Sequence, residues 1–197
     1  RIEVMGPASD DIGWLNAGSE IIVHGNASNG VMNGAAQGKV FIGGSIGARG
    51  MTMTKRNPRF EPPELWVLGT AGDYFGEFMA GGIAVICGHD TDLKDQILGY
   101  RPLVGMVGGK VFTRGNAKGF SQKDAKLSLL SDEDWNWLLS HLSIFLENIN
   151  KKELLKSFSK RSQWQLLEAK SPQEKASGPE KHSMSWFREK VWEKELG

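Results

Sequence analysis

Ile83-Ala-Val-Ile-Cys-Gly88 is one of five short apolar runs that end in glycine. The other four are Glu20-Ile-Ile-Val-His-Gly25, Lys39-Val-Phe-Ile-Gly-Gly44, Glu64-Leu-Trp-Val-Leu-Gly69 and Lys110-Val-Phe-Thr-Arg-Gly115. Successive terminal glycines lie 19, 25, 19 and 27 residues apart. A repeat of about twenty residues, lengthened twice by insertions, indicates stacked units, none of which can bury its apolar face alone.

Two aligned positions within these runs are almost wholly aliphatic or β-branched. Because side chains two apart in a strand share a face, the two positions predict one narrow core. They hold Ile21, Val40, Leu65, Ala84 and Val111, and then Val23, Ile42, Val67, Ile86 and Thr113. The position between them points the other way and holds Ile22, Phe41, Trp66, Val85 and Phe112. This second apolar row needs a cover from the same chain or from a partner.

The short intervals leave no room for helical crossovers between parallel strands, and such connections are right-handed by default. We therefore expect a mainly β fold, a right-handed parallel β-helix that forms a solenoid with roughly 19-residue coils, followed by a C-terminal α-helical extension. Structural glycines are expected at the ends of the runs and at tight corners before them. They are Gly25, Gly44, Gly69, Gly88 and Gly115, with Gly38, Gly82 and Gly109 at the corners.

Glycine and tryptophan are unevenly distributed along the chain. Of 25 glycines, 23 precede residue 120, whereas five of the seven tryptophans follow residue 130. This shift predicts a β-helix over residues 1–125, a helical extension over 126–170, and a linker with a terminal helix over 171–197, the helix itself spanning 186–196. Ser131 is expected to cap a helix that ends near Ile149. That helix should cover the outward apolar row, with the capping of an open coil end as the rival use.

Composition excludes several classes of function. Lys and Arg total 24 against 23 Asp and Glu, so the net charge of +1 provides no basic face for nucleic acid. No apolar stretch approaches the roughly eighteen residues of a membrane span, and we expect no membrane partner. One cysteine excludes an internal disulfide and a cysteine-rich metal site. The cytoplasm is the expected compartment.

Candidate chemistry is confined to two glycine-rich turns and one thiol. Gly44-Ser-Ile-Gly47 and Gly69-Thr-Ala-Gly72 follow predicted strands but lack the G-x-G-x-x-G spacing, so corner glycines are favoured over a phosphate cradle. Cys87 has no base beside it in the sequence and is expected to be a small packing residue. We therefore predict no catalytic, cofactor-binding or metal-binding residues in this chain.

A longer motif resembles a known family. Gly72-Asp-Tyr-Phe-Gly-Glu-Phe-Met-Ala-Gly-Gly82 is similar to the most recognisable stretch of the GXGXG repeat domain at the C-terminal end of the glutamate synthase large subunit. Gly105-Met-Val-Gly-Gly-Lys-Val-Phe-Thr-Arg-Gly115 looks like the next coil of that domain, and Gly43-Gly-Ser-Ile-Gly-Ala-Arg-Gly50 like the preceding one. The resemblance covers about residues 10 to 120. It implies a right-handed β-helix without catalytic residues, here as a stand-alone subunit.

The resemblance also implies a function. The chain would be a non-catalytic scaffold or spacer in glutamate biosynthesis, inactive alone but part of an oxidoreductase complex. Its partners would be a glutaminase (amidotransferase) and an FMN-dependent synthase, with FMN and an iron–sulfur cluster on those partners, and it could also form a homo-oligomer. The alternatives are a β-helix subunit of a formylmethanofuran dehydrogenase in C1 metabolism and an independent carbohydrate-active β-helix.

The two insertions are the expected places for partner contacts. They contain Lys55-Arg-Asn-Pro-Arg59 and the segment from Asp90 to Pro102. Loops added to a rigid scaffold project from it and often carry contacts. Lys55, Arg56, Arg59 and Arg101 are therefore the candidate interface residues, and solvated loops without a partner are the alternative.

Overall fold

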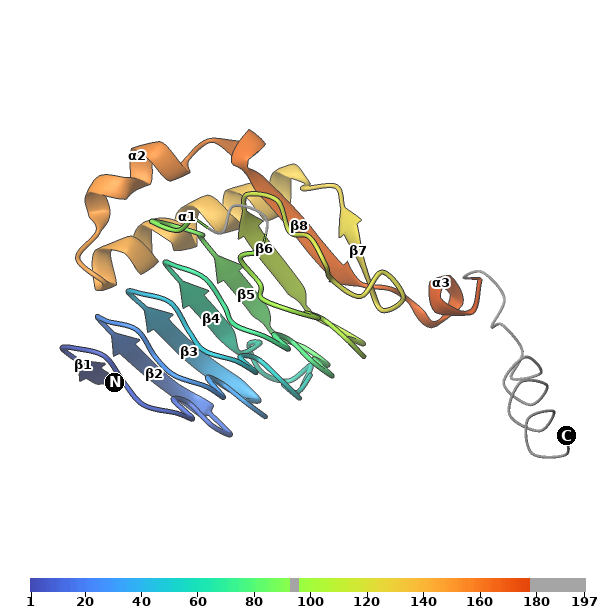
Figure 1. Ribbon diagram of the computed structural model, residues 1–197, viewed down its shortest axis with the longest axis horizontal. Coiled ribbons are helices and arrows are strands. Elements are labelled where there is room, and N and C mark those ends of the chain that lie inside the picture. The colour runs from blue at the N-terminus through green and yellow to red at the C-terminus, as the bar shows by residue number, and fades with distance from the viewer. Residues whose placement is uncertain (93–95, 178–197) are drawn as a thin grey trace, which may run out of the picture.

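The computed structural model describes residues 1–92 and 96–177, which contain one eight-stranded sheet. Its strand order is β1-β2-β3-β4-β5-β6-β8-β7 (Figure 1). The strands are β1 (Ile2–Val4), β2 (Ala17–Val23), β3 (Gln37–Ile42), β4 (Glu64–Val67), β5 (Ile83–Ile86), β6 (Lys110–Arg114), β7 (Ala125–Ser128) and β8 (Trp164–Ala169). Strands β1 to β6 pair in parallel, whereas β8 pairs antiparallel with both β6 and β7.

The helical segments of the described chain all follow β7. They are α1 (Asp132–Asn148), the 3₁₀ turns η1 (Lys152–Leu154) and η2 (Arg161–Gln163), α2 (Leu155–Phe158) and α3 (Pro172–Ala176). The terminal helix expected over 186–196 lies outside the described residues. None of the described helices has the length and apolar character needed to span a lipid bilayer.

The register of the parallel strands confirms the alignment of the repeats. Val40 of β3 lies opposite Ile21 of β2 and Leu65 of β4. Ala84 of β5 and Val111 of β6 continue the same line. Equivalent side chains of successive repeats are therefore stacked across the sheet.

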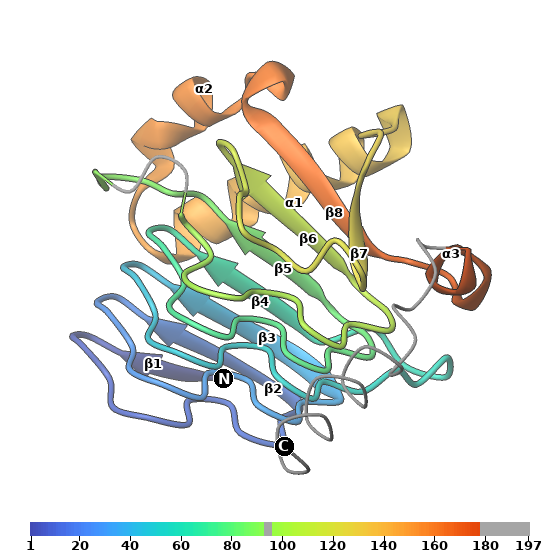
Figure 2. The ribbon, with the colours of Figure 1, turned by 45° about the vertical axis from the view of Figure 1, so that its right-hand side comes forward.

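The predicted right-handed parallel β-helix is wrong. The described strands join a single mixed sheet, and β8 runs against its neighbours. The connections between the parallel strands contain turns and isolated bridges, not the strands of a further sheet. Their backbone returns to positive φ, for example +57° at both Met32 and Met51, which interrupts an extended strand. The architecture is an α/β fold, with turns on one side of the sheet and α1 and α2 on the other (Figure 2).

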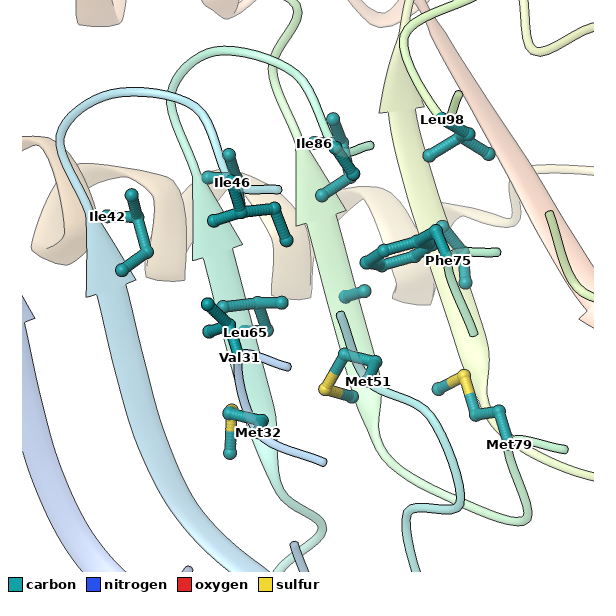
Figure 3. Close-up of a cluster of buried hydrophobic side chains, with 14 of the residues drawn as sticks. Val31, Met32, Ile42, Ile46, Met51, Leu65, Phe75, Met79, Ile86 and Leu98 are labelled. Carbon is teal, nitrogen blue, oxygen red and sulfur yellow. The ribbon is translucent and has the colours of Figure 1, made fainter. Parts of the chain in front are cut away.

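The main apolar cluster lies between the sheet and its turns (Figure 3). Both predicted inward rows point into it, and Val40, Ile42 and Leu65 are fully buried there. The turns contribute a second set of fully buried side chains, namely Val31, Met32, Met51, Phe75, Met79 and Leu103. Each repeat thus buries its turn against its own and neighbouring strands.

The opposite face of the sheet is covered by α1, which confirms the lateral placement predicted for this helix. Its N-cap is Ser131, as predicted, and the Ser131 Oγ accepts a hydrogen bond from the Asp134 backbone nitrogen at 3.0 Å. The ring centroid of Phe145 lies 5.9 Å from that of Phe41 and 5.5 Å from that of Trp66. The covered row comprises Ile22, Phe41, Trp66, Val85 and Phe112, and the helix buries Leu138, Leu142, Phe145 and Leu146.

Strand β8 was not anticipated from the sequence. It pairs along the whole of β6, with Leu167 opposite Val111 and Leu166 opposite Phe112. Leu167 packs in the cluster on the turn side, and Leu166 packs in the cluster under α1. The C-terminal extension therefore covers one face of the sheet and also the backbone edge of its last parallel strand.

Candidate partner interface

The turns between the strands stack in register through backbone hydrogen bonds. The Asp11 nitrogen donates to the Asn29 carbonyl, Arg49 to Asp73, and Tyr74 to Tyr100, all at 2.8 Å. Each bond joins one turn to the equivalent turn of the next repeat. Because the turns are tied layer to layer, their side chains form continuous rows along the stack.

One outward row is basic and aromatic at its centre. Its members are Asp11, Gly30, Arg49, Tyr74 and Arg101. The guanidinium carbon of Arg49 lies 5.9 Å from the ring centroid of Tyr74. The ring of Tyr74 in turn meets that of Tyr100 edge to face, at 6.2 Å between centroids. We call this set the arginine–tyrosine row.

A second outward row is apolar and lies four positions further along every turn. Its members are Leu15, Gly34, Met53, Phe78 and Gly105. Leu15, Met53 and Phe78 are more than half exposed, at 55, 53 and 56 %. A Cβ at Gly34 would come within 2.7 Å of Leu15, and one at Gly105 within 2.4 Å of Phe78. The two glycines of this apolar row therefore leave room for large side chains that lie along the surface.

Bulky residues in both rows hold a left-handed backbone. The φ angles are +61° at Arg49, +59° at Tyr74 and +51° at Arg101, and +54° at both Met53 and Phe78. Glycine adopts this conformation without steric cost, whereas a bulky residue is strained by about 1–3 kcal/mol. The side chains of these rows are thus held outward at a cost to backbone stability.

The predicted interface residues fall into two places. Lys55, Arg56 and Arg59 are exposed on the loop between β3 and β4, and none forms an ion pair within residues 1–92 and 96–177. Arg101 is exposed in the arginine–tyrosine row, not on that loop. Thr54 and Lys55 are still tied to neighbouring turns by backbone hydrogen bonds, and the exposed loop follows them, so the apolar row and the basic loop are close in the chain.

The eight glycines expected to be structural lie at the ends of the strands. Gly25, Gly44, Gly69, Gly88 and Gly115 follow β2 to β6 by one or two residues. Gly38 is the second residue of β3, and Gly82 and Gly109 directly precede β5 and β6; their φ angles are +93°, +103° and +100°.

The glycine-rich turns are filled by their neighbours. A Cβ at Gly69 would lie 2.2 Å from the Ser45 hydroxyl, and one at Gly72 would lie 2.7 Å from the Gly47 backbone. A side chain at either glycine would clash with the preceding turn, so the close packing of successive turns accounts for both glycines.

Cys87 is fully buried under α1 and α2, and burial raises the pKa of its thiol to about 12 despite the nearby Arg114. Burial also lowers the pKa of Arg114, whose guanidinium carbon lies 4.1 Å from the ring centroid of Phe158. A thiol in this state is a poor nucleophile because its thiolate is scarcely populated at neutral pH.

Two shallow depressions of about 280 and 270 Å³ are also present. The first contains Lys110 and Asp134, whose charged atoms lie 2.6 Å apart. Burial would raise the pKa of Asp134, but hydrogen bonds from Lys110 and Ser131 outweigh it and hold the pKa below its usual value. These groups anchor the start of α1 to β6. The second depression includes Ser45, His89 and Lys151.

In the described part of the chain, no three His, Cys, Asp or Glu side chains are grouped as a metal site would require.

Comparison with known proteins decides the family. Residues 1–163 match the GXGXG motif family, and this match covers most of the chain. The chain belongs to the GXGXG motif family. An uncharacterized protein of the archaeon Methanocaldococcus jannaschii is 28 % identical over 186 residues, which cover 83 % of this chain and 70 % of the relative. The GXGXG motif family is linked to glutamate synthase-type proteins, in agreement with the resemblance of the Gly72–Gly82 segment.

Sequence reasoning missed the two outward rows. The repeats were aligned on the strands, whereas the rows are formed by residues of the turns. In the turns, residues at positive φ alternate between outward and buried positions. A signal was nevertheless present. Arg49, Tyr74 and Arg101 each stand four residues before Met53, Phe78 and Gly105, at the spacing that Gly30 and Gly34 repeat.

Proposed function

We propose that this member of the GXGXG motif family is a non-catalytic scaffold of a glutamate synthase-type complex. The observation that carries the proposal is the family match over residues 1–163, which covers strands β1 to β7 and α1 and ends directly before β8. In such a complex, an amidotransferase releases ammonia from glutamine and an FMN-dependent partner with an iron–sulfur cluster uses it to form glutamate. We place this complex in the cytoplasm, with FMN and the cluster on the partners.

The way the chain uses its own apolar surface supports a scaffold. One face of the sheet is buried by the turns and the other by α1, with Ile42 and Phe145 fully buried. Cys87 is buried with a raised pKa, and Lys110 is paired with Asp134. The outside of the turns exposes Leu15, Met53 and Phe78 together with Arg49 and Arg101, where a neighbouring protein can reach them.

A scaffold has a specific kinetic consequence. It holds two active sites at a fixed separation, so its loss should damage their coupling more than either half-reaction. The test is to delete the gene for this chain in its own organism and to assay cell extracts. Glutamine-dependent glutamate formation should fall strongly, while glutaminase activity and ammonia-dependent glutamate formation should be largely retained. Unchanged glutamine-dependent synthesis in the deletion strain would overturn the proposal.

A further inference from the structure

We propose that the outward side of the turns is the docking face for an acidic protein partner, with the arginine–tyrosine row and the apolar row as its two contact lines. This inference rests on the proposed function, because it takes the occupant to be one of the two catalytic partners. It adds which surface of the chain is used and what chemistry the partner must present.

The composition of the two rows fits a protein interface. The two rows expose Arg49, Met53, Phe78 and Arg101, while Tyr74 is half-buried and the adjacent Tyr100 is 64 % exposed. Arginine, tyrosine, phenylalanine and methionine are the residue types enriched at interfaces, and arginine and tyrosine often dominate the binding energy. The two rows run in parallel because every turn supplies one member to each. A partner ridge that follows the stack can therefore contact both.

The charge of this face selects the partner. The first layer of the arginine–tyrosine row carries the carboxylates of Asp10 and Asp11. The three layers formed by residues 49–59, 73–78 and 100–105 instead carry five cationic side chains, and their carboxylates are those of Asp73 and Glu77. One of the two is already engaged, since an oxygen of Asp73 accepts a hydrogen bond from the Tyr100 nitrogen at 2.8 Å. The whole chain has a net charge of only +1, so the excess is local. A complementary surface presents carboxylates around an apolar ridge.

The exposed Met53 and Phe78 side chains favour a protein over a nucleic acid. Contacts to a phosphate backbone need cations spread along a groove. Here Arg49 and Arg101 instead flank the apolar row, whose members are all apolar residues or glycine.

The left-handed backbone provides a test that separates binding from folding. At positive φ, replacing a bulky residue by glycine removes steric strain, and both rows already contain glycine at Gly30, Gly34 and Gly105. The variant Tyr74→Gly, Phe78→Gly and Arg101→Gly should therefore fold, with a melting temperature close to that of the unchanged protein. Asn150→Gly is the matched control, because Asn150 is also exposed, has φ of +58°, and follows α1 on the other side of the sheet.

The experiment is to express each tagged variant in cells that lack the native copy and to quantify the co-purified amidotransferase and FMN-dependent chains. We expect recovery of the partner to fall by about tenfold or more for the triple variant and to stay unchanged for Asn150→Gly. Recovery from the unchanged protein should also fall as salt is raised, since exposed charges are screened.

Equal recovery with the triple variant would overturn the docking face and leave the proposed function intact. Recovery of neither chain with the unchanged protein would overturn the proposed function and this inference together. Two further results would overturn the acidic protein partner in favour of another occupant. A dimer seen by light scattering and abolished by the triple variant would identify a second copy of the chain. Nucleic acid that co-purifies with the unchanged protein and is lost from the triple variant would identify a nucleic acid.

Discussion

Truncation of Phe145 to alanine should show how strongly α1 is fixed to the sheet. The Phe145 side chain is fully buried, and its ring contacts both Phe41 and Trp66. Removing a buried phenylalanine side chain costs about 3–5 kcal/mol, because transfer free energy and packing are lost together. A domain of ordinary stability has only about 5–15 kcal/mol, so the loss should be obvious.

The neighbouring Ile144 supplies the control. It belongs to the same turn of α1 but is 51 % exposed, so Ile144→Ala should cost no more than about 1 kcal/mol. Guanidinium unfolding of both variants, followed by tryptophan fluorescence and by far-ultraviolet circular dichroism, measures the two losses. Similar free energies of unfolding for the two variants would refute the account of α1 as the cover of the sheet.

Three further predictions concern the cores and the titratable groups. Ile42→Asp should lower the free energy of unfolding by several kcal/mol in chemical denaturation, because it buries an unpaired charge. Ile2→Asp should cost far less, because the Ile2 side chain is 55 % exposed. Equal losses for the two variants would contradict the assigned core. The pKa of Asp124 is lowered because hydrogen bonds from Ser121 and Gly105 and the charge of Lys175 outweigh its burial, so its contribution to stability is present above its ordinary pKa of 3.8 and is lost as pH falls below it. Asp124→Asn should therefore lose less stability than the unchanged protein as pH falls from about 5 to about 2, and an identical pH dependence would count against this role. Cys87 should resist a thiol-specific disulfide reagent at pH 8 in the folded protein and react after unfolding, because burial raises the pKa of its thiol to about 12. Rapid labelling of the folded protein would instead show that the thiol is accessible.

The strand positions could be predicted because their side chains follow a strict period of two. Ile42 and Phe41 point to opposite faces of one strand, and the structure buries them in different clusters. The cover by α1 was predictable for the same reason, since the outward apolar row and the apolar helix face each need a partner.

The closure of the fold could not be predicted in this way. The single mixed sheet depends on β8, whose residues Leu166 and Leu167 lie more than fifty residues beyond the β6 strand that they pair with. Long-range antiparallel pairing leaves no local period in the sequence. The predicted β-helix also needs strands in the connections, but Met32 and Met51 hold a left-handed backbone there, and the period of the five strand runs contains no signal of it.

The interface was predicted only in part. Insertion length pointed to Lys55, Arg56 and Arg59, which are exposed, but it could not show that Arg101 shares a row with Arg49 and Tyr74. That neighbourhood follows from the layer-to-layer hydrogen bonds of the turns, which depend on the register of the whole stack.

The central claim is that this chain works as the structural part of a glutamate synthase-type complex. The most direct measurement is affinity purification of the tagged chain from its own cells, followed by identification of the associated proteins and by flavin and iron assays. The account predicts an amidotransferase and an FMN-dependent iron–sulfur protein in fixed ratio to the chain, with flavin and iron lost when the partners are removed. Recovery with a molybdopterin-dependent protein instead, or glutaminase activity that stays with the isolated chain, would contradict it.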